Sequence, residues 1–128
     1  FFIPRVDPDK VGAYLEAADA LLVHLRADPL FEITLPSKTQ AYMYAGKPIL
    51  MAVNGEAARV TRTAMAGIVA TPENPQSLAD AVRTLTNMSS SERYKIGQSG
   101  REYYMRELSM DKGMKRFAEI FSRVRAQK

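Results

Sequence analysis

The chain has 128 residues, of which 46% are hydrophobic, and this size and composition suit one domain over residues 1–128. The absence of cysteine excludes a disulfide framework and a thiolate metal site, and a single histidine argues against a histidine metal cluster or a Ser-His-Asp triad. No apolar run reaches the roughly 20 residues of a membrane-spanning helix. The net charge is +4.

Basic residues gather toward the end of the chain, at Lys112, Lys115, Arg116, Arg123, Arg125 and Lys128. Such charge attracts nucleic acid, anionic lipid or a nucleotide. No helix-turn-helix, zinc-finger or RNP signature accompanies it, so we do not expect a nucleic-acid partner. We expect a solvated helix face here, and peripheral membrane contact is the alternative.

Strands alternate with helices through the first part of the sequence. The patterns predict strands at 1–3, 20–25, 49–53 and 67–70. They predict helices at 9–18, 37–46, 55–64, 77–85, 89–104 and 110–124. This alternation is typical of βαβ units, so we expect an α/β fold with a Rossmann-like, three-layer parallel sheet followed by C-terminal helices.

Four details of the pattern lead to local expectations. The run 20–25 is apolar at successive positions, which predicts a strand covered on both faces; His24 near its end is either half-buried and structural or part of a site. Ser89 and Glu92 fit a capping box at the start of a helix whose weak points are Gly97 and Gly100. In the last helix, an apolar face at helical spacing predicts core packing through Met110, Met114, Phe117, Phe121 and Val124.

The helix at 37–46 has clear start and stop signals. Ser37 follows Pro36 and is the expected N-cap, Gly46 can adopt the left-handed conformation that ends a helix, and Pro48 prevents its continuation. A helix N-terminus that follows a strand and a loop favours anion binding, because its free backbone N–H groups and dipole point into that loop. Ser37 and Thr39 add hydroxyl donors, and Lys38 adds a positive charge. The alternative is an ordinary capped helix with a solvated lysine.

A longer set of residues resembles a known family. The set contains Pro4, Asp9-Lys10-Val11, Tyr14, Ala18-Asp19-Ala20-Leu21-Leu22-Val23, Leu35-Pro36-Ser37-Lys38, Tyr42, Gly46-Lys47-Pro48-Ile49, Gly55-Glu56, Ala66-Gly67, Pro72, and Leu78-Ala79 with Ala81. It resembles the C-terminal half of retaining GT-B glycosyltransferases of the GT4 family, in the branch that makes bacterial surface polysaccharide and includes the L-fucosamine transferases.

The resemblance implies a donor-binding domain for a nucleotide-diphosphate sugar, with UDP-sugar as the expected donor. It implies an N-terminal acceptor domain in the same chain, upstream of Phe1. The sequence Phe1-Phe2-Ile3 starts abruptly and resembles a truncated strand, so we expect a fragment of a longer protein. A cytoplasmic setting is expected, with the inner face of the membrane as an alternative. Alone, residues 1–128 are expected to be inactive, because half of the cleft is missing.

The resemblance also assigns the site residues. The nucleotide-sugar site would comprise Glu32, Leu35, Pro36, Ser37, Lys38, Thr39 and Gln40, with Glu32 and Lys38 in catalytic roles. In many members one glutamate contacts the sugar hydroxyls and a second contacts the ribose. Glu32 matches the first, displaced by one position, whereas Ala41 stands at the second. The ribose contact therefore comes from Gln40, from elsewhere, or is not made.

The implied mechanism is retaining transfer, in which the departing diphosphate is stabilised by the helix N-terminus, Lys38 and hydroxyl donors. No cofactor is expected, and no acidic cluster in the sequence predicts a magnesium site. Two alternatives remain open: a non-catalytic α/β interaction domain whose basic last helix docks on a partner, and a sugar-nucleotide epimerase with the same GT-B architecture.

Overall fold

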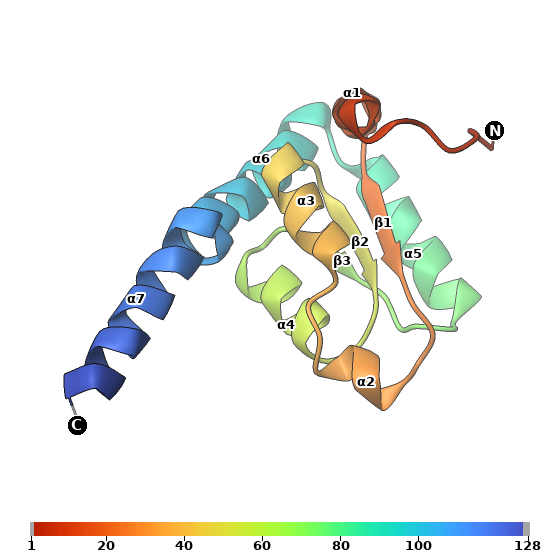
Figure 1. Cartoon of the computed structure of the whole chain (residues 1–128). Helices are drawn as coiled ribbons and strands as arrows, with labels where there is room; N and C mark the ends of the chain where they lie inside the picture. The colour runs from red at the N-terminus through yellow and green to blue at the C-terminus, as the bar shows by residue number, and fades with distance from the viewer. Residues whose placement is uncertain (1, 127–128) are drawn as a thin grey trace.

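The fold is a parallel sheet between two layers of helices, seen here in a computed structural model that describes residues 2–126 (Figure 1). The three strands lie in the order β1 (Leu21–His24), β2 (Ile49–Ala52) and β3 (Gly67–Val69). Leu21 pairs with Ile49, and Ile49 pairs with Gly67. The predicted fold class is confirmed, with three strands in the described residues.

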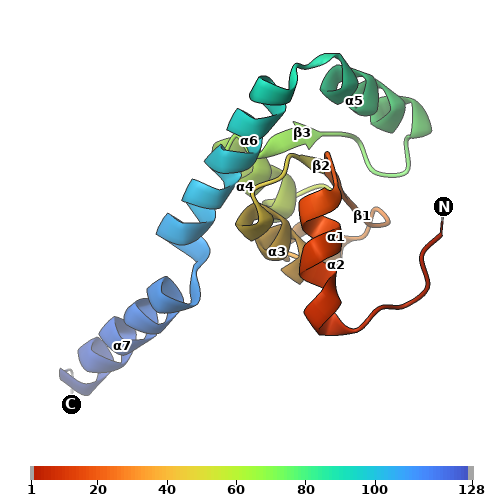
Figure 2. The same ribbon diagram turned by 90° about the horizontal axis from the view of Figure 1, so that it is seen from above.

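Helices cover both faces of this sheet, as the view from above shows (Figure 2). One face carries α3 (Ser37–Ala45) and α4 (Glu56–Thr63), and the other carries α5 (Pro75–Asn87). The main core lies under α3 and α4, where Val23, Met43, Ile49 and Met51 are buried. A smaller cluster of Ala52, Ala70 and Ala81 lies under α5.

The remaining elements surround this centre. The chain begins with a 3-10 turn (Pro8–Lys10) and α1 (Val11–Ala17), which packs against α3. A short helix, α2 (Pro29–Glu32), interrupts the loop after β1. After α5 come α6 (Ser90–Tyr103), a π-helical turn η2 (Tyr104–Leu108) and α7 (Met110–Ala126).

Several start and stop signals are confirmed at the level of atoms. Gly46 adopts the left-handed conformation, with φ 68° and ψ 32°, at the end of α3. Ser89 and Glu92 form the predicted capping box: the Glu92 amide donates to Ser89 Oγ at 3.2 Å, and the Ser89 amide donates to the Glu92 carboxylate at 2.8 Å. These local hydrogen bonds satisfy amides that would otherwise have no partner at the helix start.

Three expectations about strands and burial are wrong. Phe1 lies outside the described residues, but Phe2 and Ile3 form no strand, because no neighbouring strand supplies backbone partners there. Strand β1 is covered on one face only: α5 packs over β2 and β3, so Leu22 is 46% exposed and His24 is also exposed.

The third wrong expectation concerns α7. Its apolar residues do not join the core, and Phe117 and Phe121 are 64% and 67% exposed. Helix α7 packs against η2 and projects away from the sheet (Figures 1 and 2). Lys128, one of the basic residues singled out in the sequence, lies outside the described residues.

Gly97 is a site of close packing and does not weaken α6, which is continuous from Ser90 to Tyr103. A Cβ atom at Gly97 would lie 2.0 Å from the carbonyl oxygen of Gly46, so the two backbones touch where α6 crosses the end of α3. Gly100 is similarly buried, and a Cβ atom there would lie 2.9 Å from the Ala66 side chain. Because Gly97 and Gly100 have no side chains, α6 can pack directly against α3 and cover the core there.

We therefore expect Gly97→Ala to destabilise the fold by about 1–3 kcal/mol, because the added methyl group forces the helices apart. The measurement is the free energy of unfolding from urea titration followed by circular dichroism. Gly12→Ala is the matched control, since nothing lies within 4 Å of a Cβ atom at Gly12 in α1. A Gly97→Ala variant as stable as the control would contradict this account of the contact.

Candidate functional site at the carboxyl edge of the sheet

The start of α3 differs from the prediction by one residue. Pro36, not Ser37, occupies the N-cap position, with φ −56° and ψ 138°, and Ser37 is the first helical residue. The Pro36 carbonyl accepts a hydrogen bond from the Thr39 amide at 2.9 Å. Ser37 is thus not the N-cap, because the extended conformation needed at that position falls on Pro36.

This shift leaves the helix start open. No side chain caps α3, since Pro36 has no side-chain acceptor. Within residues 2–126, no hydrogen bond is found for the Ser37 or Lys38 amide. The Ser37 and Lys38 side chains are exposed beside these amides, and Lys38 forms no ion pair in the same residues. The result is a positive helix end with free donors.

The helix start lies at the carboxyl edge of the sheet. Strand β1 runs into the loop and α2, and α3 then returns antiparallel to the strands so that β2 can pair parallel with β1. Helix α4 follows β2 and begins at the same edge (Figure 1). In open α/β sheets this edge is where ligands bind.

The loop 26–34 contains a short helix and is held by two hydrogen bonds. Asp28 caps α2 through its Oδ1, which accepts a hydrogen bond from the Leu30 amide at 2.9 Å. Farther along, Glu73 Oε2 accepts a hydrogen bond from the Ala27 amide at 3.1 Å and ties the loop to the segment after β3. Glu32, the last residue of α2, carries an exposed side chain before the turn into α3.

Gly55 fixes the position of Glu32. Gly55 precedes α4 with φ 71° and ψ −136°, a conformation that other residues rarely adopt. A Cβ atom there would lie 2.0 Å from the carbonyl oxygen of Glu32, so the turn after β2 contacts the backbone of α2 directly. The sequence analysis did not predict this contact. The feature that could have indicated it is the glycine that directly precedes a predicted helix.

The structure places the predicted site residues in two groups. Glu32, Ser37 and Lys38 are exposed around the loop and helix start. Leu35, Pro36 and Gln40 are half-buried, and Thr39 is fully buried. The Thr39 hydroxyl has no hydrogen-bond partner in residues 2–126, which is unusual for a buried polar atom. Ala41, where a ribose-binding glutamate was expected, is exposed.

His24 does not join the start of α3. It is exposed at the end of β1 and lines a hollow of about 290 Å³ on the α5 side, with Ala52, Thr71, Glu73 and Leu78 among its neighbours. The expectation that His24 is a half-buried structural residue is therefore wrong. His24 lies at the carboxyl edge of the sheet, on the other face from α3.

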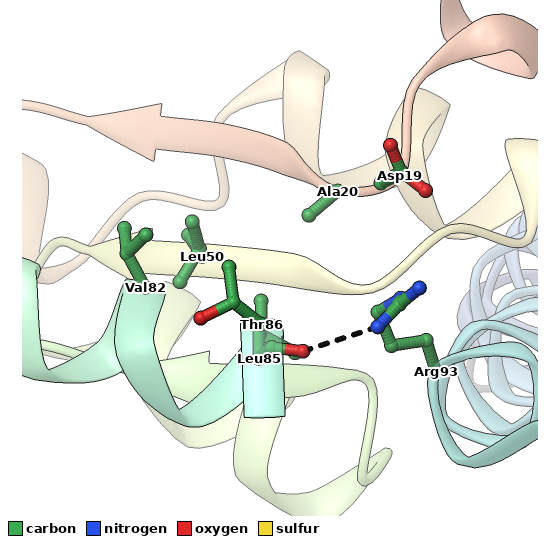
Figure 3. A pocket seen from close by; sticks show the side chains of 7 residues that line it. All are labelled: Asp19, Ala20, Leu50, Val82, Leu85, Thr86 and Arg93. Atoms are coloured by element: carbon green, nitrogen blue, oxygen red, sulfur yellow. Dashed lines mark hydrogen bonds between the residues drawn. The ribbon is translucent and has the colours of Figure 1, made fainter. Parts of the chain in front are cut away.

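A second hollow of about 290 Å³ lies at the opposite edge of the sheet (Figure 3). Asp19 and Ala20, which precede β1, lie on one side, and Leu50, Val82 and Leu85 form an apolar lining. Arg93 lies at one end and donates a hydrogen bond to the Leu85 carbonyl at 3.4 Å. The hollow is the space that α5 leaves over β1, and it lies far along the strands from the start of α3.

The charges next to the candidate site are paired. Arg59 donates two hydrogen bonds to the carboxylate of Glu56 in the first turn of α4, at 2.7 Å from Nε and 2.6 Å from a terminal nitrogen. These bonds hold the pKa of Glu56 below its usual range. In residues 2–126 no group of three or more His, Cys, Asp and Glu side chains is arranged to hold a metal ion.

The parallel sheet, the helices on both faces and the open helix start at its carboxyl edge define a Rossmann-like domain. Residues 1–88 match the family described as Glycosyl transferases group 1, and the chain therefore belongs to that family. A search of curated proteins gives no match.

The fold is similar to part of a solved structure, the sucrose-phosphate synthase from Thermosynechococcus elongatus. The alignment covers 100% of this chain and 31% of that chain, with a TM-score of 0.83 and 16% sequence identity. At this identity the likeness shows the fold alone, a Rossmann-like part of the GT-B architecture. The chain thus spans about a third of the length of the structure that it matches.

The Glu56–Arg59 pair leads to a pH prediction. The Glu56 pKa is lower in the folded state, so the pair stabilises the fold above the unfolded pKa of Glu56 and loses this effect as pH falls through the folded pKa. We expect Arg59→Gln to raise the Glu56 pKa toward its ordinary value, measured by NMR titration of the glutamate carboxyl carbons. Arg83→Gln, which removes the similar Asp80 pair on α5, should leave the Glu56 titration unchanged.

Proposed function

We propose that this chain is the donor-binding half of a retaining glycosyltransferase and that the start of α3 binds the diphosphate of a nucleotide sugar. The observation that carries the proposal is the uncapped N-terminus of α3 at the carboxyl edge of the sheet, with Ser37 and Lys38 exposed beside it. An anion there gains hydrogen bonds to free amides, the helix dipole and a lysine ammonium at once.

The proposed roles follow from the position of each residue. The Ser37 and Lys38 amides and side chains would hold the phosphates, with Leu35 and Pro36 shaping the turn that presents them. Glu32, held in place by Gly55, would accept hydrogen bonds from the sugar hydroxyls. Gln40, on the next turn of α3, would reach the ribose that Ala41 cannot contact.

Thr39 adds support from inside the helix. Its buried hydroxyl lacks a partner although it lies in the same first turn of α3, two residues from Ser37. A buried donor without a partner costs free energy, and an ordered water held by it would recover that cost. The same turn therefore combines free amides, a lysine and an unused hydroxyl.

These groups would stabilise the negative charge that develops during glycosyl transfer. As the bond between the sugar and the diphosphate breaks, negative charge develops on the leaving phosphate oxygen. Donors and positive charges that are already in place lower the barrier, because they do not have to reorganise at that moment. Retention of configuration requires the acceptor to attack from the face that the diphosphate leaves. Lys38 would hold the diphosphate on that face, and Glu32 would hold the sugar hydroxyls.

The finer identity belongs to the same proposal. The proposed donor is a UDP-sugar. The proposed family is GT4, in the branch that makes surface polysaccharide. The proposed location is the inner face of the cytoplasmic membrane. An N-terminal domain of the same chain would supply the acceptor side of the cleft. The likeness to about a third of a larger GT-B structure supports that organisation.

The test is a titration of the 128-residue chain with UDP, followed by amide NMR shifts. We expect saturable shifts centred on Glu32 and residues 37–40. Lys38→Ala should weaken binding about ten- to a hundredfold, because a charged hydrogen bond is worth about 1.5–3 kcal/mol. Its free energy of unfolding should change little, since Lys38 is exposed.

Lys95→Ala is the matched control, because Lys95 is an exposed lysine on α6, the helix that crosses the opposite end of α3 at Gly46. It should leave UDP binding unchanged. Equal losses in both variants, or shifts confined to the hollow beside Asp19 and Arg93, would overturn the assignment. Saturable binding would also exclude the non-catalytic interaction domain, and product analysis of the full-length protein without acceptor separates a transferase from an epimerase.

A further inference from the structure

Glu73 adopts a backbone conformation that is unusual for its residue type. It lies in the turn between β3 and α5 with φ 57°, in the left-handed region that glycine adopts without steric cost. In residues 2–126, Met65 is the only other non-glycine residue with a positive φ. Such a conformation costs free energy and persists where the surrounding structure maintains it. A glutamate at this position is explained if its side chain makes a contact that glycine cannot make.

The turn that carries Glu73 is fixed to the start of α5. The Thr71 amide donates a hydrogen bond to Ser77 Oγ at 2.9 Å, and the Ser77 amide donates one to Asn74 Oδ1 at 2.9 Å. Pro72, which lies between Thr71 and Asn74 in the sequence, is buried. These contacts determine the backbone on both sides of Glu73, so its side chain extends from a rigid base.

The Glu73 side chain reaches the loop that follows β1. Its Oε2 accepts a hydrogen bond from the Ala27 amide at 3.1 Å, across 46 positions of the sequence. Within residues 2–126, this is the only hydrogen bond that joins residues 26–34 to another part of the chain. Figure 1 shows both segments at the carboxyl edge of the sheet, where β1 leads into α2 and β3 leads toward α5.

Helix α2 is consequently held at both ends. At its start, Ala27 directly precedes Asp28, whose side chain caps the helix. At its end, Phe31 packs against the main core, and the Glu32 carbonyl oxygen lies only 2.0 Å from where a Cβ atom of Gly55 would be. A four-residue helix that is held at one end alone can pivot about that end. Because both ends are held, the direction of the Glu32 side chain is set.

We propose that Glu73 is a positioning residue for Glu32 and acts through the Ala27 amide and α2. The inference rests on the proposed function, in which the Glu32 carboxylate accepts hydrogen bonds from the sugar hydroxyls of a nucleotide sugar. Such bonds are directional, so a carboxylate whose direction is fixed before binding loses less freedom when the sugar binds.

The diphosphate part of the proposed site is held separately. The start of α3 is fixed by the burial of Thr39 and Met43, which does not involve Glu73. Loss of the contact between Glu73 and Ala27 should therefore weaken recognition of the sugar and leave binding of the diphosphate largely intact.

Three variants of the 128-residue chain separate this contact from the backbone strain. Glu73→Gly removes the carboxylate and relieves the strain, whereas Glu73→Gln keeps an oxygen that can accept the Ala27 hydrogen bond. Met65→Gly is the matched control. Met65 also has a positive φ, 49°, and an exposed side chain, but it lies between α4 and β3 at the amino edge of the sheet.

The first measurement is the hydrogen-exchange rate of the Ala27 amide, followed by NMR without ligand. We expect Glu73→Gly to raise this rate about three- to tenfold, which corresponds to the loss of one hydrogen bond at an exposed site. Glu73→Gln and Met65→Gly should change it less than about twofold. The urea midpoint of Glu73→Gly should change little, because relief of the strain offsets the lost bond.

The second measurement compares the dissociation constants of UDP and of UDP-glucose, a probe whose sugar carries free hydroxyls. Glu73→Gly should weaken binding of UDP-glucose about three- to tenfold and binding of UDP less than about twofold. Glu73→Gln should retain most of the affinity for UDP-glucose. A merely structural role of Glu73 would weaken the binding of both ligands equally.

An Ala27 exchange rate that Glu73→Gly leaves unchanged, or that Met65→Gly raises equally, would overturn the proposal whether or not the chain binds ligand. Equal weakening of UDP and UDP-glucose binding would also overturn it, as would equal losses in Glu73→Gly and Glu73→Gln. Failure of both ligands to bind the unmodified chain would overturn the proposed function and the role for the sugar. The Ala27 exchange rate, measured without ligand, distinguishes that failure from absence of the contact.

Discussion

The packing of α3, the helix that connects β1 to β2, against one face of the sheet is the constraint on which the rest of this structure depends. Two neighbouring parallel strands need a connection that crosses back over the sheet, and α3 forms this connection between β1 and β2. Met43 and Thr39 on its inner side are fully buried, which fixes the rotation of the helix about its axis. The same rotation leaves Ser37 and Lys38 exposed at its start, so the core and the candidate site are set by one helix.

Close backbone contacts maintain this arrangement at both ends of α3. At the far end, Gly97 lets α6 touch Gly46, where the left-handed turn leads into β2. At the near end, Gly55 lets the turn after β2 touch Glu32. Neither contact tolerates a side chain, and together they hold the site between two fixed points. A precise site on a loop requires such support from the scaffold.

Within residues 2–126, large apolar side chains are exposed on the sheet and on α7. The face of β1 on the α5 side exposes Leu22 and a hollow with an apolar lining. Helix α7 exposes Phe117, Phe121 and other apolar side chains. The chain belongs to the family described as Glycosyl transferases group 1 and spans about a third of the structure that it matches. Exposed apolar area alone does not identify what covers either surface.

The sequence by itself determined the features that depend on a few neighbouring residues. The α/β alternation, the Gly46 stop and the Ser89–Glu92 capping box all follow from local sterics and hydrogen bonds, and all are confirmed. Only the tertiary structure decided which apolar residues are buried. Period and composition show that Leu22 or Phe117 lies on an apolar face, but burial requires a partner element in space, and α5 and the core are placed elsewhere. The shift from Ser37 to Pro36 at the start of α3 likewise depends on the backbone path of the preceding loop, and it leaves the helix start without a side-chain cap.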